Sequence, residues 1–281
     1  MSLGILTNVA ATYAENNLNQ TQSSLQTTLQ QLSSGSRINS GADDAAGLSV
    51  ADGLKANEAA LTQSAQNAQN GVGLLQTADG ALSQVTNLLD RATTLATEAS
   101  NGGLTTAQTT AADTEFQSIV TEIGNIGGKT NFNSTNVFSA TATNFVVTDG
   151  TTAGTTTIAA TTGALSTASV GTATGGGAGV TLSGLSLVTG AAAALTAVNN
   201  AITDVANQRG AIGANINQLN AAANVASSEQ VNLSSAESSI RSTNYGQATS
   251  DLAKYQVLNQ TGISALAQAN SVQQEMLKLL Q

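Results

Sequence analysis

The last quarter of the chain carries apolar side chains at alternating steps of three and four residues. The set is Tyr255, Leu258, Gly262, Ala265, Ala269, Val272, Met276 and Leu279. Steps of this size keep one stripe of an α-helix facing a partner. Because most helical stability comes from packing such a stripe, the pattern predicts a long amphipathic helix that needs neighbours.

The first stretch of the chain has a matching pattern. Leu18, Leu25 and Leu32 are seven residues apart, and the pattern breaks after Ser34 at Gly35. We therefore expect a second terminal helix. The two terminal helices either close a small bundle within one molecule or are buried between copies of the molecule in a polymer. We use the name terminal seam for the apolar positions that would make these contacts: Leu18, Leu25, Leu32, Tyr255, Leu258, Ala265, Val272, Met276 and Leu279.

Two further long helices are predicted between the ends. The first has apolar residues every seven positions, ending before Asn101-Gly102-Gly103: Leu54, Leu61, Ala68, Leu75, Leu82, Leu89 and Ala96. The second alternates steps of three and four from Val188 to Ile240, interrupted only by Arg209, Gln230 and Glu237. From Leu195 to Ile240 this is roughly 70 Å of helix at ~1.5 Å per residue, so the middle of the molecule is predicted to be a rod.

A shorter helix is predicted between these two. Thr105 and Gln108 have the spacing of a capping box at its start. Its apolar stripe consists of Phe116, Ile119, Val120, Ile123 and Ile126. The stripe stops at Gly127-Gly128, where we expect the helix to end.

The acidic pair Asp43 and Asp44 stands before the first long central helix. Paired carboxylates serve as acid–base or metal groups in many enzymes. The alternative is negative charge placed at a helix N-terminus, where the helix dipole favours it. We favour the alternative, because no partner base or ligand cluster is nearby in the sequence.

The amino-acid composition of the chain changes after the short helix. No charged residue occurs from Gly150 to Thr203, and Thr, Ala and Gly dominate. Phe145 and Val147 alternate before a turn at Asp149-Gly150, and a second strand follows over Thr155 to Ala160, which predicts a hairpin. The other interpretation is a flexible low-complexity loop. We favour a small β-rich outer segment.

The amino-acid composition argues against several classes of function. The chain of 281 residues has no Pro, Cys or His, and its net charge is −9. Without His and Cys the commonest general base and transition-metal ligands are missing, so we assign no catalytic, cofactor-binding or metal residues. The eight Lys and Arg residues are scattered, which argues against nucleic-acid binding. No apolar run is long enough for membrane insertion, and no Lys or Arg precedes the short apolar patch at the start, so no cleaved signal peptide is expected. These tests alone would place the protein in the cytosol unless it leaves by another export route.

Three stretches carry a resemblance to a known family. Residues 37–85, beginning RINSGADDAAGLSVADGL, resemble the N-terminal signature of bacterial flagellin. Residues 233–281, beginning LSSAESSIRSTNYGQ, are similar to its C-terminal signature, and KTNFN at 129–133 also fits. The match covers both flanks of the chain in the family's order, while the uncharged middle lies in the part that the family varies.

The resemblance implies a mainly α fold. Residues 1–42 and 241–281 would pair as an inner coiled-coil domain lining a tube. Residues 43–140 and 188–240 would form a rod-like helical bundle, and residues 141–187 a small variable β-rich segment facing solvent. The protein would be a structural subunit that assembles into the flagellar filament for swimming motility. The alternative is a hook–filament junction protein, a relative that does not form long filaments. An enzyme is not expected, since a protease insert would need an HExxH zinc motif and the chain has no His.

The resemblance also implies partners and a location. The partners are other flagellin subunits in a helical homopolymer, the filament cap, the hook-junction proteins and an export chaperone. The location is the extracellular flagellum, reached through a type III export channel without a cleaved signal peptide, which replaces the cytosolic expectation.

A receptor patch is a further implication. Many flagellins present an Arg, a Leu and a Glu to a vertebrate Toll-like receptor, and Arg91, Leu95 and Glu115 stand at those places here. The surrounding DRATTLA differs from the commoner pattern, with Thr93 and Thr94 where charged residues are usual. The alternative is that Arg91 and Glu115 are solvated residues or contacts between subunits.

Overall fold

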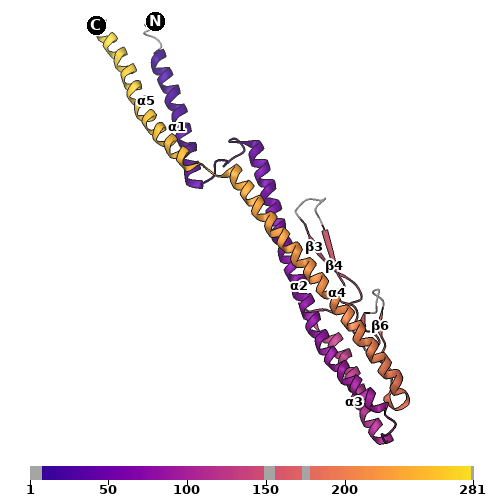
Figure 1. Cartoon of the computed structure of the whole chain (residues 1–281). Helices are drawn as coiled ribbons and strands as arrows, with labels where there is room; N and C mark the ends of the chain where they lie inside the picture. The colour runs from indigo at the N-terminus through magenta and orange to yellow at the C-terminus, as the bar shows by residue number, and fades with distance from the viewer. Residues whose placement is uncertain (1–7, 149–155, 173–177, 280–281) are drawn as a thin grey trace. The chain divides into compact units, whose positions relative to one another are not determined.

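The computed structural model describes residues 8–148, 156–172 and 178–279. Helices dominate the described chain, as predicted, and the strands are short (Figure 1). The helices are α1 (Val9–Ser34), α2 (Ala45–Ala99), α3 (Thr106–Lys129), α4 (Leu187–Arg241) and α5 (Tyr245–Leu279). The strands are β1 (Asn131–Phe132), β2 (Thr135–Asn136), β3 (Thr143–Val147), β4 (Thr156–Ala160), β5 (Val170–Thr172) and β6 (Ala178–Val180).

The chain divides into two compact units. The terminal unit is Met1–Ala56 with Asn232–Gln281, and the central unit is Asn57–Val231. The central unit therefore holds α3, all six strands and most of α2 and α4. The terminal unit holds α1 and α5.

Helix α1 ends where the sequence predicted. Gly35 follows its last residue with φ of 72°, and the Gly35 N–H donates to the Gln31 carbonyl at 3.0 Å. A positive φ is free of steric cost only for glycine, which is why Gly stops the helix here.

The heptad pattern of α2 forms the core of the central unit. Every member of the predicted series from Leu61 to Ala96 is buried. The facing helix α4 buries Val198, Val205, Ile212, Leu219 and Ala226, all from the predicted stripe. The two helices therefore pack through the positions that their periodicity selects.

Helix α4 also buries polar groups that the periodicity did not indicate. Asp204 and Gln208 lie on the buried face, at 9% and 2% exposure. The Gln208 side-chain amide donates to the Thr162 carbonyl of the outer segment. The continuous helix starts after Gly190, whose backbone is not helical.

Helix α3 has the predicted capping box but ends later than expected. Gln108 Oε1 accepts from the Thr105 N–H at 2.9 Å, and the Thr105 hydroxyl accepts from the Gln108 N–H at 3.4 Å. The helix continues through Gly127-Gly128 to Lys129, so the expected end is wrong by one to two residues. Gly127 instead serves close packing, since a Cβ there would overlap the Leu165 backbone.

The outer segment is β-rich, as predicted, and the predicted hairpin forms as the antiparallel pair β3–β4. Strand β3 pairs with β4 in a register that sets Phe145 opposite Ile158. The predicted turn at Asp149-Gly150 lies outside the described residues. Two more pairs, β1–β2 and β5–β6, complete the strands of the described chain. Buried side chains in this segment, Ile158, Leu165, Val170 and Leu182, join the core of the central unit.

Hydrogen bonds tie the β3–β4 hairpin to α2. The Ser64 hydroxyl donates to the Thr148 carbonyl at 2.7 Å, and Asn67 Nδ2 donates to the Val146 carbonyl at 3.1 Å. Phe145 packs against Gly71, where a Cβ would come within 3.1 Å of its ring. The described part of this segment is therefore packed against the helices, which excludes the loop interpretation for β3 and β4.

Candidate assembly surface

Helices α1 and α5 form an antiparallel pair within the terminal unit (Figure 1). Near the start of α1, Asn8 Nδ2 donates to the Ala269 carbonyl at 3.0 Å. Further along, Leu18 packs on Gly262, where a Cβ would lie 3.2 Å from Leu18 Cδ1. The small residue at Gly262 lets the helices approach closely at this point.

The terminal seam is only partly covered by this pairing. Leu18, Leu25, Leu32 and Tyr255 are half-buried. Leu258, Ala265 and Val272 are exposed, with Leu258 and Val272 each at 43%. The side chains of Met276 and Leu279 lie outside the described residues.

More large apolar side chains are exposed beside the seam. Tyr13 is 68% exposed on α1, and Ile263 is 48% exposed on α5. Val9 and Val257 are exposed as well. Single exposed apolar residues are ordinary, but this many on one helix pair is typical of an interaction surface.

A junction of backbone hydrogen bonds joins the segment after α1 to the segment between α4 and α5. The Arg37 N–H donates to the Arg241 carbonyl at 2.6 Å, and the Thr243 N–H donates to the Gly35 carbonyl at 3.0 Å. Arg37 Nη2 donates to the Ile240 carbonyl at 2.7 Å. This guanidinium thus satisfies a carbonyl at the end of α4, where the helix dipole favours a cation.

Sequence reasoning missed this junction. It treated SSGSRINSG only as a break between helices. The available signal was the cation Arg37, placed between two glycines in a chain with few cations. The spacing of Arg37 and Arg241, more than two hundred residues apart, offers no local cue to their contact.

The two members of the acidic pair before α2 make different contacts: Asp44 caps the helix, and Asp43 binds the segment that precedes it. Asp44 Oδ1 accepts from the Gly47 N–H at 2.8 Å. Asp43 Oδ2 accepts from the N–H groups of Asn39 at 3.0 Å and Ser40 at 2.9 Å, and these bonds lower the pKa of Asp43. The predicted role of charge at a helix N-terminus is confirmed for Asp44. No cluster of three His, Cys, Asp or Glu side chains suited to a metal ion occurs among the described residues.

Arg91 and Glu115 form an ion pair between α2 and α3. Arg91 Nε donates to Glu115 Oε1 at 2.7 Å and Nη2 donates to Oε2 at 3.0 Å. The hydrogen bond to Arg91 lowers the pKa of Glu115, and the same bond raises the pKa of Arg91. Leu95 is buried at 2% exposure, so a ligand at this surface would meet Arg91 and Glu115 but not Leu95.

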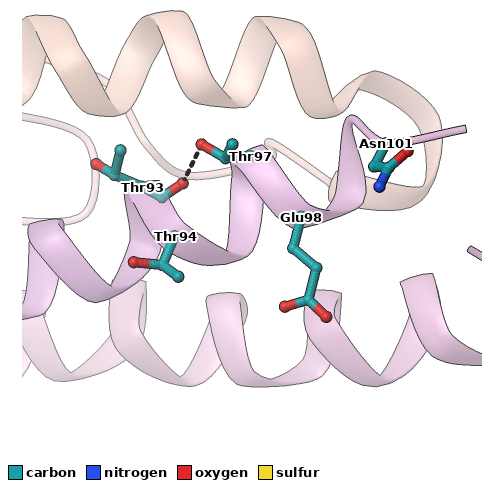
Figure 2. A pocket seen from close by; sticks show the side chains of 5 residues that line it. All are labelled: Thr93, Thr94, Thr97, Glu98 and Asn101. Carbon is teal, nitrogen blue, oxygen red and sulfur yellow. Dashed lines mark hydrogen bonds between the residues drawn. The ribbon is translucent and has the colours of Figure 1, made fainter.

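An open hollow lies further along α2. Figure 2 shows its lining side chains, Thr93, Thr94, Thr97, Glu98 and Asn101. The Thr97 hydroxyl donates to the Thr93 carbonyl at 2.8 Å, as threonine hydroxyls commonly do inside helices. The lining side chains include one carboxylate, Glu98, and no cation, so they do not favour binding of an anion.

Over the described residues, no helix combines the length and apolar character of a membrane span.

Comparison with known proteins identifies the family. Residues 5–143 match the bacterial flagellin N-terminal helical region, and residues 195–280 match the bacterial flagellin C-terminal helical region. The chain is 30% identical to a flagellin of Listeria innocua over 98% of both chains. It is 31% identical to a flagellar filament 30.7 kDa core protein of Treponema maltophilum, over 97% of this chain and 98% of that protein. A flagellin of Escherichia coli is 39% identical over 50% of this chain and 28% of its own length. The chain therefore belongs to the bacterial flagellin family and is a structural subunit of the flagellar filament rather than an enzyme.

Proposed function

We propose that subunits join in the filament through the terminal seam and the exposed apolar side chains beside it. The observation that carries this proposal is the exposure of Leu258 and Val272 on a helix whose neighbouring row, at Gly262 and Ala269, already contacts α1. Burying apolar surface is worth about 25 cal/mol per Å², so a partner that covers these side chains gains free energy. Contacts of a head-to-tail kind that do not close into a ring build open helical filaments.

The proposal assigns a role to each part of the chain. Residues 1–42 and 241–281 line the tube, residues 43–140 and 188–240 form the surrounding rod layer, and residues 141–187 face the solvent. The exposed apolar side chains of α1 and α5 support the first assignment, because such residues need cover. The Thr-rich composition of the outer segment supports the last.

Seeded polymerisation tests the proposal. Purified protein is heat-dissociated, cooled and mixed with short filament seeds, and filament length is measured by electron microscopy. Leu258→Asp and Val272→Asp should each abolish elongation, because burying an unpaired carboxylate in an apolar contact is strongly unfavourable. Truncation after Leu252 should also abolish elongation while leaving most of the helical circular dichroism signal.

Gln260→Asp is the matched control. It adds the same charge to an exposed polar position of α5 and should elongate normally. Normal elongation by both Leu258→Asp and Val272→Asp would remove the seam from the subunit contact. Failure of the unmodified chain to elongate, beside a working flagellin control, would favour the hook–filament junction role, and binding to hook ends would then be measured.

The location of the protein is the extracellular flagellar filament, in keeping with its family. We further propose that it leaves the cell through a type III channel with its first residues retained, and that an export chaperone shields α5 until then. The exposed apolar side chains of α5 support the chaperone role. The filament cap and hook-junction proteins would contact the same terminal helices. Sequencing the N-terminus of subunits sheared from cells tests retention, and loss of the N-terminal residues would contradict it.

A further inference from the structure

Asn101 and Gly102 lie in the exposed turn between α2 and α3. The Asn101 N–H donates to the Glu98 carbonyl at 3.0 Å, and the Asn101 carbonyl accepts from the Leu104 N–H at 3.4 Å. The Gly102 N–H donates no hydrogen bond to any group in the part of the chain that the structure describes. The Asn101 side chain is exposed, and Figure 2 shows it on the lining of the hollow.

We propose that Asn101 is a site of spontaneous deamidation. The backbone nitrogen of Gly102 loses its proton to solvent and attacks Cγ of Asn101. A bond forms between this nitrogen and Cγ, Nδ2 takes a proton from solvent, the bond from Cγ to Nδ2 breaks, and ammonia leaves. Water then opens the cyclic imide at one of its two carbonyls, which yields aspartate or isoaspartate in the chain. Every step uses only the chain and water.

The chemistry depends on what the glycine contributes. A residue with a Cβ hinders approach of its nitrogen to the preceding side chain, whereas glycine leaves the path open and lets the backbone rotate. The nitrogen must also be free of a hydrogen bond that holds it away from Cγ. The Gly102 N–H meets both requirements, because it lies past the last helical residue of α2, Ala99.

The chain contains an internal comparison. Asn70 and Gly71 form the same dipeptide, but both lie inside α2. There the Gly71 nitrogen takes part in the helical hydrogen bonding, and the helix holds it away from the Asn70 side chain. Gly71 is also packed against Leu219 and Phe145, so its backbone has no room to rotate. The fold therefore selects Asn101 over Asn70.

The product changes the charge at the end of α2. The last turn of α2 contains no basic residue, and Glu98 lies beside Asn101 on the lining of the hollow in Figure 2. A new carboxylate here adds a second negative charge to the lining of this hollow, at the negative end of the helix dipole. Deamidation should therefore loosen the last turn of α2.

The experiment ages the folded full-length protein at mildly alkaline pH, below its unfolding temperature, and maps its peptides by mass spectrometry. We expect the Asn101 peptide to gain the mass of an amide-to-acid conversion and to contain isoaspartate, while the Asn70 peptide stays unchanged. In denaturant both peptides should convert at similar rates, because only the fold distinguishes them.

Two glycine variants test the mechanism. A Cβ at Gly102 meets no atom within 4 Å, so Gly102→Ala should fold normally and lose the conversion at Asn101. Gly103→Ala is the matched control: its Cβ would meet only Asn101 Oδ1, at 3.8 Å, and it keeps the Asn-Gly pair, so it should convert at the original rate. Equal rates at Asn101 and Asn70 in the folded chain, or undiminished conversion in Gly102→Ala, would overturn the proposal.

Discussion

The terminal and central units carry the same heptad pattern of apolar residues, but they differ in how far those residues are buried. In the central unit, Leu75, Leu82 and Leu89 are fully buried by partners from the same chain. In the terminal unit, Leu258 and Val272 stand at the same kind of position and remain 43% exposed. The spacing of apolar residues therefore indicates which face of a helix needs cover. It does not indicate whether that cover comes from the same molecule.

The difference follows from the number of elements available. The central unit surrounds α2 with α3, α4 and the outer hairpins, so each apolar stripe finds a partner. In the part of the terminal unit that the structure describes, α1 is the helix that packs along α5, and a pair of helices can bury only one stripe of each. The terminal unit is the part of the chain that gains most from contact with other subunits.

The largest expected effect comes from truncating a buried leucine of the central unit. Leu82→Ala should lower the free energy of unfolding of the monomer by about 2–5 kcal/mol, because it removes buried methyl groups and leaves a cavity. Leu258→Ala, in the terminal unit, should change it by less than about 0.5 kcal/mol. Denaturant unfolding of monomers measures both. If both variants lost the same free energy of unfolding, Leu258 would be as well packed in the monomer as Leu82, and the two units would not differ in this respect.

A pair of neighbouring glycines in α3 gives a smaller and more local effect. A Cβ on Gly127 would overlap the Leu165 backbone, whereas a Cβ on Gly128 meets no atom within 4 Å. Gly127→Ala should destabilise the monomer by about 1–3 kcal/mol through overpacking. Gly128→Ala should stabilise it by roughly 0.5–1 kcal/mol, since alanine is the better helix former. Thermal unfolding distinguishes the two, and a stable Gly127→Ala variant would show that the outer segment is not fixed against α3.

The sequence predicts the helices well because their patterns are long. A stripe that repeats through many turns, as from Leu54 to Ala96, fixes both the element and its buried face. The end of α1 was predicted correctly because Gly35 is needed there for its positive φ. The end of α3 was not, because Gly127 is needed for close packing against Leu165, which a local reading cannot foresee.

The periodicity of apolar residues does not predict contacts between segments that are far apart in the sequence. Gln208 lies outside the predicted stripe of α4, yet it is buried, and its amide donates to the Thr162 carbonyl. The stripe of α5 offers apolar residues on two neighbouring rows. Only the structure shows that Gly262 packs on Leu18 of α1 while Leu258 and Val272 stay 43% exposed. The receptor patch depends on a family comparison, and burial of Leu95 became evident only from the fold.

The smallest expected effect is on the pH dependence of stability, to which two carboxylates contribute with opposite signs. Burial raises the pKa of Asp204 in the central unit, and backbone hydrogen bonds from Asn39 and Ser40 lower the pKa of Asp43 in the terminal unit. A raised folded pKa means that the native state holds the proton more tightly than the unfolded chain. Ionised Asp204 therefore opposes folding at neutral pH, and that cost disappears as the pH falls below the ordinary range of an aspartate. The lowered pKa of Asp43 has the opposite sign, so its contribution is present at neutral pH and is lost on acidification through its folded pKa.

Substitution separates the two contributions. Asp204→Asn should raise the free energy of unfolding at neutral pH, and its advantage should shrink as the pH falls, because protonated Asp204 is neutral as well. Asp43→Asn should lower the free energy of unfolding at neutral pH and approach the unmodified chain in acid. Denaturant unfolding at a series of pH values measures both, with Asp52→Asn, an exposed position inside α2, as the control. A destabilised Asp204→Asn at neutral pH would show that its carboxylate stabilises the fold, and the two units would then share the same dependence on pH.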